Sequence, residues 1–195
     1  EVHIGHRAEN IQGADCIIRT AAAHNDNPEI AAARAAGIPI FERAQAWGHL
    51  MRSYKNAICV AGTHGKTTTT SMISEVLLAD NDDPTLSIGG ILKSIGGNIR
   101  VGKSDYFVTE ACEYTNSFLS FFPRISIILN IEEDHLDFFK DINDIRHSFH
   151  KFAQILPEDG YLIINGGIDN LQEITGDLPC NVITFGKDPS CDYSY

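Results

Sequence analysis

The sequence lacks any apolar run approaching the roughly 18 to 20 residues that a membrane-spanning helix needs, which argues against a spanning segment. Basic residues are also few, with 15 Lys and Arg against 26 Asp and Glu, and the formal net charge is −11. This balance argues against nucleic acid or an anionic membrane as a partner, because both attract clustered cations. A phosphate ligand stays open, since it needs only a local nest of N–H groups and one cation.

Paired cysteines and a start signal are missing as well. The five cysteines are odd in number and contain no C-x-x-C pair, so neither a zinc ribbon nor a disulfide scaffold is indicated, and a reducing cytoplasm is the simplest location. The N-terminus has neither the basic nor the apolar region of a signal peptide, and the only methionines are Met51 and Met72. We therefore expect the 195 residues to begin inside a longer protein.

What the chain does contain is a regular alternation of short apolar runs and helical stretches, which predicts an α/β fold with a parallel sheet and right-handed crossovers. The chain turns polar near residues 53–56, and we place a domain boundary there, between 1–55 and 56–195. Glycines in the segment 96–102 indicate a hairpin or loop. Strands are expected at 16–18, 38–40, 57–61, 85–88, 106–109, 125–129, 161–164 and 182–185, and helices at 28–36, 43–54, before 79, after 141 and near 170.

Two of the expected helices have one-sided apolar patterns. In the helix that ends near residue 79, the spacing of Met72, Ile73, Val76 and Leu77 predicts a single buried face. The later helix has Asp141 as its expected N-cap. Its apolar residues, at gaps of three or four, are Ile142, Ile145, Phe149, Phe152 and Leu156.

The most informative stretch lies between a predicted strand and the first of these helices, where a phosphate loop is expected. Its glycines would let backbone N–H groups surround phosphate oxygens, Lys66 would add charge, and the Thr67 hydroxyl could bind Mg²⁺. The pattern is G-x-x-G-K-T, because Val60 stands where the generic eight-residue pattern has its first glycine. The residues expected to bind the nucleotide are Gly62, Thr63, His64, Gly65, Lys66, Thr67 and Thr68.

Acidic loops follow two other strands. Glu110 and His135 both lie beyond strand C-terminal ends, the edge where ligands bind in an open parallel sheet. Glu110 beside Thr67 would provide enough protein ligands for one Mg²⁺, which usually keeps several waters. His135 could bind a second metal or hydrogen-bond a phosphate. The alternatives are a structural His135 and solvated acids. Those acids are Glu110, Glu113, Glu132, Glu133, Asp134 and Asp137. The aromatic cluster at 118–122 is expected to belong to the core and not to form a base-stacking platform.

Taken together, these motifs resemble the Mur ligases, which build the stem peptide of peptidoglycan. The loop with His64 is similar to that of the alanine-adding members and of the murein-tripeptide recycling ligases. Residues 109–114 resemble the family's E-A-x-E segment, and residues 130–137 resemble its N-I-E-x-D-H-x-D motif. Upstream, residues 27–30, 37–39 and 43–44 resemble the later part of the N-terminal domain.

The resemblance implies an ATP- and Mg²⁺-dependent ligase that joins L-alanine to UDP-N-acetylmuramate through an acyl phosphate. Residues 1–55 would then be the remnant of a Rossmann-like UDP-binding domain, and 56–195 most of the central ATP-binding domain. The implied catalytic residues are Lys66, Glu110 and His135, with Thr67, Glu110 and His135 at the metals. The implied substrate contacts are His64, Gly89, Gly90 and Asn130.

The chain also departs from the family pattern. Cys112, Tyr114 and Thr115 stand where many members carry Asp, Ser and Asp, so no contacts are carried over to them. The glycine-rich start, the later G-x-H-N segment and a C-terminal domain are absent, so we expect a fragment that is inactive alone. Other Mur-type ligases, including folylpolyglutamate synthases, a phosphate-loop switch or transport ATPase, and a non-catalytic nucleotide-binding module remain alternatives, and oligomeric state is not predicted.

Overall fold

The computed structural model describes residues 1–20 and 22–195 and divides the chain into two compact units, 1–48 and 49–195. The division falls inside the helix α2 (Arg43–Met51), seven residues before the boundary between residues 55 and 56 that the sequence predicts. None of the helices in the described part of the chain combines the length and the apolar character needed to cross a membrane.

The first unit is a small α/β segment. Asn27 caps its main helix by accepting a hydrogen bond from the N–H of Glu29, and Pro28 occupies the first turn, where the sequence predicts the helix to begin. Its two strands pair in parallel and are tied by the ion pair of Arg19 with Glu42, 2.6 Å apart. The elements are η1 (Ala8–Ile11), β1 (Ile17–Arg19), α1 (Pro28–Ala35), β2 (Ile40–Glu42) and α2 (Arg43–Met51).

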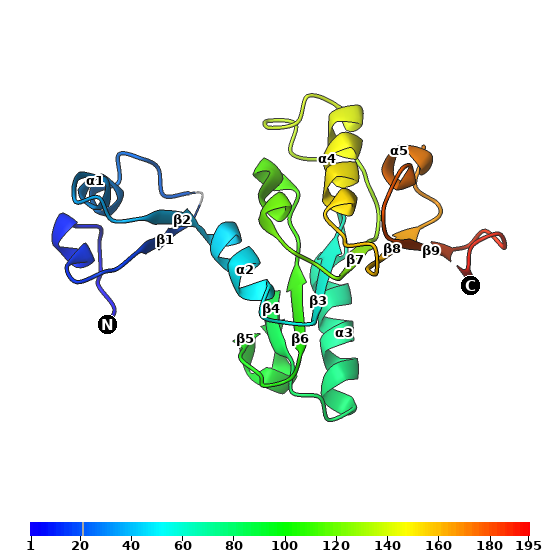
Figure 1. Ribbon diagram of the computed structural model, residues 1–195, viewed down its shortest axis with the longest axis horizontal. Coiled ribbons are helices and arrows are strands. Elements are labelled where there is room, and N and C mark those ends of the chain that lie inside the picture. The colour runs from blue at the N-terminus through cyan, green and yellow to red at the C-terminus, as the bar shows by residue number, and fades with distance from the viewer. Residues whose placement is uncertain (21) are drawn as a thin grey trace. The chain divides into compact units, whose positions relative to one another are not determined.

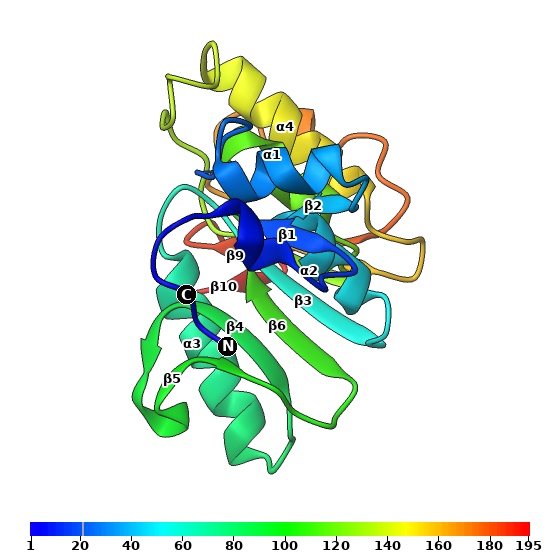
Figure 2. The same ribbon diagram turned by 90° about the vertical axis from the view of Figure 1, so that its left-hand side faces the viewer.

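The second unit is built on an eight-stranded sheet in which every neighbouring pair is parallel except β4 with β5 (Figures 1 and 2). This confirms the predicted α/β class with a mostly parallel sheet. In spatial order the strands are β10 (Tyr193–Ser194), β9 (Asn181–Gly186), β8 (Tyr161–Asn165), β7 (Ile125–Ile128), β3 (Asn56–Ala61), β6 (Tyr106–Glu110), β4 (Thr85–Leu92) and β5 (Gly97–Arg100).

Helices cover the sheet in the second unit. The helix α3 (Lys66–Ala79) packs against β3, β4 and β6, and α4 (Ile142–Gln154) packs against η3 (Tyr114–Ser120) and α5 (Gln172–Thr175). Asp141 caps α4 by accepting hydrogen bonds from the N–H groups of Asn143 and Asp144, which confirms the predicted N-cap. The segment 96–102, expected to be a hairpin or loop, instead contains β5, the second strand of an antiparallel hairpin with β4, and the turn of that hairpin is η2 (Lys93–Ile95).

The buried face predicted for α3 is confirmed for Ile73 and Leu77 and wrong for Met72 and Val76. Met72 and Val76 are 64% and 68% exposed, whereas Ile73 and Leu77 pack on the sheet. The helix turns its smaller polar residues Thr70 and Ser74, both fully buried, toward the core, and Ser74 donates its hydroxyl proton to the Thr70 carbonyl. Met72 and Val76 are four residues apart and therefore share the opposite face.

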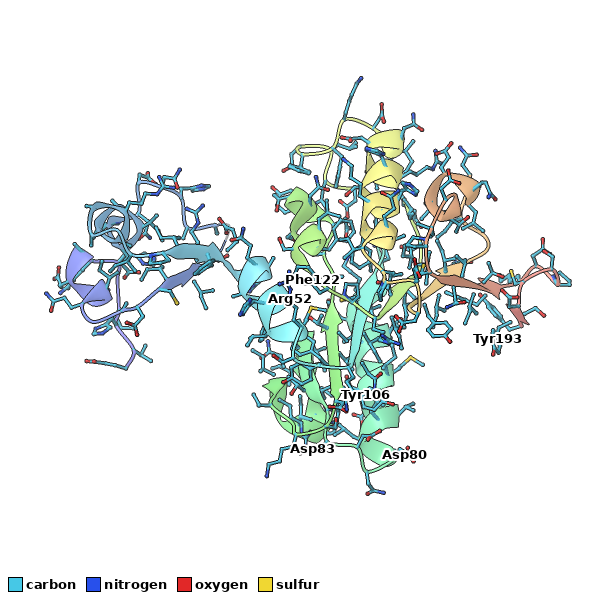
Figure 3. The ribbon with its side chains drawn as sticks, viewed as in Figure 1. Arg52, Asp80, Asp83, Tyr106, Phe122 and Tyr193 are labelled. Carbon is cyan, nitrogen blue, oxygen red and sulfur yellow. The ribbon has the colours of Figure 1, made fainter. Side chains whose placement is uncertain are left out.

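The aromatic cluster behaves mainly as core. Phe118 is fully buried and stacks on Phe152 of α4, with ring centroids 4.5 Å apart and planes 4° from parallel. Phe122 differs: it is 41% exposed, and the guanidinium of Arg52 lies 3.8 Å from its ring centroid (Figure 3). The prediction of a core role holds for Phe118 and Phe121 but not for Phe122.

Candidate functional site

Three neighbouring strands bring the predicted site residues to one edge of the sheet. β3 lies between β6 and β7, and its last residues pair with theirs, Val60 with Glu110 and Ala61 with Ile128. The loops after these strands therefore leave the sheet side by side, at the edge where parallel sheets bind ligands.

The phosphate loop is held from the β7 side by Asn130. The Asn130 amide oxygen accepts a hydrogen bond from the His64 N–H at 2.8 Å, and its amide nitrogen donates to the His64 carbonyl at 3.0 Å. The Asn130 carbonyl also accepts from the N–H of Thr63. Gly62 has a φ of 134°, and a Cβ there would lie 3.1 Å from the Asn130 backbone, so only glycine fits this close approach.

Lys66 is turned back over its own loop. Its Nζ donates to the carbonyls of Gly62 at 2.5 Å and Thr63 at 3.2 Å, and it lies 3.2 Å from Oε2 of Glu113. The Glu113 side chain is 3% exposed and that of Lys66 17%. The loop thus carries a largely buried ion pair, and Glu113 is not the solvated acid that the sequence allowed.

Thr67 and Glu110, the residues expected to bind the first Mg²⁺, lie next to each other. The Thr67 hydroxyl donates to Oε2 of Glu110 at 3.0 Å. The other Glu110 oxygen accepts from the N–H of Gly89, and a Cβ at Gly89 would lie 2.7 Å from both carboxylate oxygens. Gly90 lies against Thr67, since its Cβ would be 3.2 Å from the Thr67 methyl carbon. Glycines of β4 therefore leave room for the hydroxyl–carboxylate pair.

His135 lies in a second cluster that can hold a cation. One ligand atom each from Glu113, Asp134 and His135 lie within 4.8 Å of one another. Carboxylate oxygens at both places and the Thr67 hydroxyl are the hard donors that Mg²⁺ prefers, so the residues present fit that ion. The sequence suggests His135 as a metal ligand, whereas Glu113 and Asp134 are expected there to be solvated acids and not ligands.

Tyr114 and Asp137 border this cluster. The Tyr114 hydroxyl donates to Oδ2 of Asp137 at 2.9 Å, and its ring packs on His135 with centroids 4.6 Å apart. The hydrogen bond and the negative charge of Asp137 raise the pKa of Tyr114, so the phenol keeps its proton at neutral pH.

The remaining predicted residues lie on the open side of the loop. The His64 side chain is 68% exposed, with Nε2 3.6 Å from Oε2 of Glu132. Thr68 belongs to a shallow open groove of about 560 Å³ along α3. The groove is lined by Thr67, Thr68, Ser71, Met72, Glu75 and Val76. Met72 and Val76 are two of the residues that the sequence predicts to be buried.

A glycine-rich loop between β3 and α3, with a lysine and a threonine at its end, defines the second unit as an α/β domain of the phosphate-loop class. Comparison with known families agrees: the family model described as Mur ligase middle domain matches residues 60–194, and that described as Mur ligase family, catalytic domain matches residues 1–55. The chain belongs to the Mur ligase family.

Curated relatives refine this assignment. A UDP-N-acetylmuramate–L-alanine ligase of Lachnospira eligens is 64% identical over 176 residues, which are 90% of this chain and 38% of the relative. The ligase of the same description from Agathobacter rectalis is 60% identical over 194 residues, 99% of this chain and 42% of the relative. The chain thus spans about two fifths of the length of the curated relatives it matches.

Solved structures agree with the fold. The UDP-N-acetylmuramate–alanine ligase of Thermotoga maritima superposes with a TM-score of 0.79 at 34% identity, covering 94% of this chain and 41% of that one. The UDP-N-acetylmuramate:L-alanyl-γ-D-glutamyl-meso-diaminopimelate ligase of Neisseria meningitides superposes with a TM-score of 0.83 at 27% identity, covering 94% of this chain and 63% of that one.

Proposed function

We propose that the protein containing this chain joins L-alanine to UDP-N-acetylmuramate at the expense of ATP. The observation that carries the proposal is the phosphate loop, whose Lys66 and Thr67 face the acids Glu113 and Glu110 across the ends of adjacent strands. The names of the relatives supply the substrates. The free cysteines among the described residues suit a cytoplasmic location, where ATP is supplied.

The reaction is an activation followed by a substitution. A carboxylate oxygen of the lactoyl group attacks the γ-phosphorus, and the bond to the β-phosphate oxygen breaks, giving an acyl phosphate and ADP. The amine of L-alanine then attacks the acyl carbon, inorganic phosphate leaves, and the ammonium proton is released. Both steps bring anions together, so the site has to neutralise charge and align the groups.

The phosphate loop performs the first task. When phosphate oxygens enter, Lys66 exchanges the carbonyls of Gly62 and Thr63 for them and contributes its charge to the transferring phosphoryl group. The N–H groups of the loop and the start of α3 supply further donors. Asn130 keeps the loop in shape through its two bonds to His64, and we assign it this positioning role besides its predicted substrate contact.

Mg²⁺ would be held by Thr67 with Glu110, and by Glu113, Asp134 and His135. When bound, it supplies positive charge beside the phosphate oxygens. The chain's own contribution is to hold these oxygen donors ready: the Gly89 N–H fixes the Glu110 carboxylate, which in turn accepts from Thr67.

The experiment uses the full-length protein and measures ADP release with ATP, UDP-N-acetylmuramate and L-alanine. Wild-type ADP release should require both acceptor substrates, and Lys66→Ala should lower the rate by about 10² to 10³, as for loss of one phosphate-stabilising donor. Glu158→Ala, an exposed acid in the loop between α4 and β8, is the control and should retain the wild-type rate. Near-normal turnover of Lys66→Ala would contradict the phosphate role.

A second candidate is ligation of a preformed tripeptide to UDP-N-acetylmuramate. The observation that favours it is the TM-score of 0.83 to the Neisseria ligase, whose name contains that peptide. The same assay separates the two functions when L-alanine is replaced by L-alanyl-γ-D-glutamyl-meso-diaminopimelate. Preference for L-alanine supports the first function, and preference for the tripeptide supports the second.

A further inference from the structure

Tyr114 contacts the turn that carries His135 through both its ring and its hydroxyl group. Its ring lies against the imidazole at 4.6 Å between centroids with a tilt of 33°, and edge-on to Phe138 at 6.0 Å and 75°. Its hydroxyl donates to Oδ2 of Asp137 at 2.9 Å. One side chain at the start of η3, which follows β6, thus contacts three residues of the loop after β7.

The His135 backbone is fixed independently of this contact. His135 has a φ of 52°, an uncommon value for a residue other than glycine, and its carbonyl accepts from the N–H groups of Phe138 and Phe139 at 2.8 and 2.9 Å. Its own N–H donates to Oδ1 of Asp134 at 2.7 Å. The turn therefore determines where the side chain begins, but not how the ring is rotated.

The ring itself has little else to hold it. The His135 side chain is 33% exposed, and its imidazole makes no hydrogen bond to any residue that the structure describes. Nε2 lies 3.9 Å from Oδ2 of Asp134, beyond hydrogen-bonding range. The face of Tyr114 is the close ring contact that restricts its rotation.

Tyr114 is itself firmly placed. The two residues after it, Thr115 and Asn116, have φ values of 54° and 57°, so the chain turns sharply there. Ser117 donates its hydroxyl proton to the Tyr114 carbonyl at 3.0 Å, and the Asn116 amide oxygen accepts from the Ser148 hydroxyl on α4. Strained backbone that its surroundings hold in place is characteristic of functional loops.

We propose that Tyr114 is a positioning residue for His135. Its ring keeps the imidazole turned toward the carboxylates of Glu113 and Asp134, and its bond to Asp137 holds the two loops together. This inference rests on the proposed function, because it concerns the residues that would hold a cation in the ligase.

The first test is spectroscopic and needs no metal or nucleotide. In the full-length protein with ¹³C-labelled histidine, the His135 ring signal is assigned by its loss in His135→Gln. An aromatic ring stacked on the imidazole shifts its protons upfield. We expect that shift in the wild type and in Tyr114→Phe, which keeps the ring, and its loss in Tyr114→Leu.

The second test uses Mn²⁺ alone as the probe, followed by electron paramagnetic resonance. Loss of a group that orients a metal ligand commonly weakens metal affinity by about 10- to 100-fold. We expect about tenfold weaker Mn²⁺ binding in Tyr114→Leu, and a smaller loss, about threefold, in Tyr114→Phe, which removes only the bond to Asp137. The matched control is Tyr161→Leu, at the start of β8 and 43% exposed, which should change neither readout.

The outcomes separate this inference from the proposed function. A His135 signal or an Mn²⁺ affinity that is unchanged in Tyr114→Leu overturns the positioning role, even if the wild type is an active ligase. If instead the wild type has no ligase activity, the proposed function fails, while the spectroscopic result still decides the role of Tyr114. Loss of the upfield shift together with weaker Mn²⁺ binding supports the inference.

Discussion

Nζ of Lys66 lies 3.2 Å from Oε2 of Glu113, and the two side chains are only 17% and 3% exposed. The lysine that defines the phosphate loop therefore has an ion-pair partner within the protein. Removing one partner of such a pair leaves the other charge poorly solvated, which is more costly than losing an exposed ion pair.

Glu113→Ala should lower the stability of the second unit by about 3 kcal/mol, because Lys66 loses its largely buried carboxylate partner. Calorimetric thermal unfolding of the full-length protein measures this change. The double variant Lys66→Met with Glu113→Leu should recover most of the stability while remaining inactive, since apolar pairs often replace buried ion pairs at no loss. A Glu113→Ala protein as stable as the wild type would refute the importance of the pair.

Gly89→Ala should impair metal use without unfolding the protein. The new Cβ would lie 2.7 Å from both oxygens of Glu110, and the flexible end of that side chain can move away, which separates it from the Thr67 hydroxyl. We expect the half-saturating Mg²⁺ concentration for ADP release to rise about tenfold. Gly97→Ala is the matched control, because its Cβ meets nothing within 4 Å. Equal Mg²⁺ curves for the two variants would contradict the argument.

Phe118→Ala should cost about 3 to 5 kcal/mol, because it removes a fully buried ring that stacks on Phe152 and meets Phe149 edge-on. Phe122→Ala should cost only about 1 kcal/mol, since its ring is 41% exposed and loses mainly the contact with Arg52. Chemical denaturation monitored by circular dichroism compares the two. The order of the two losses is the prediction, and a reversed order would show that the ring stack is not the core.

Thiol chemistry should divide the cysteines by burial. Burial raises the pKa of Cys59, whose side chain is fully enclosed in β3, whereas Cys16 is exposed. Because the reagent needs access to the sulfur and reacts with the thiolate, iodoacetamide should modify the exposed Cys16 and leave the buried Cys59 intact. Peptide mass spectrometry identifies the modified residue. Modification of Cys59 in the folded protein would contradict its burial.

The same shift has a consequence for stability. The pKa of Cys59 is higher in the folded than in the unfolded protein. The stability that the protonated, buried thiol contributes is therefore fully present below the ordinary thiol pKa of about 8.5, and it is lost as the pH rises above that value. The free energy of unfolding should therefore fall above that pH, and this part of the fall should be absent in Cys59→Ala.

The sequence was sufficient where local rules decide the outcome. The cap at Asp141, the strand–loop–helix order around Lys66 and the alternation that gives a parallel sheet are all local patterns, and each is present in the structure. The position of Glu110 beside Thr67 also follows, because two adjacent parallel strands end at the same edge.

Other features depend on packing that no local pattern encodes. Met72 and Val76 satisfy the helical spacing, yet the sheet accepts Thr70 and Ser74 instead. Nothing in the sequence distinguishes Glu113 from a solvated acid. Its burial is favourable only because Lys66 folds back over its own loop and pairs with it. Similarly, the contact of Tyr114 with His135 joins loops more than twenty residues apart and follows from two turns with positive φ.

The strand order has a consequence for how the site arises during folding. Val60 pairs with Glu110 and also with Ile127, so the three loops meet only after distant segments of the chain have found one another in parallel register. Such non-local pairing is slow, because the entropy of closing long loops is lost before the contacts form. Nucleotide affinity should therefore return in the slowest phase of refolding, together with completion of the central sheet, and not with the early formation of α3 or α4.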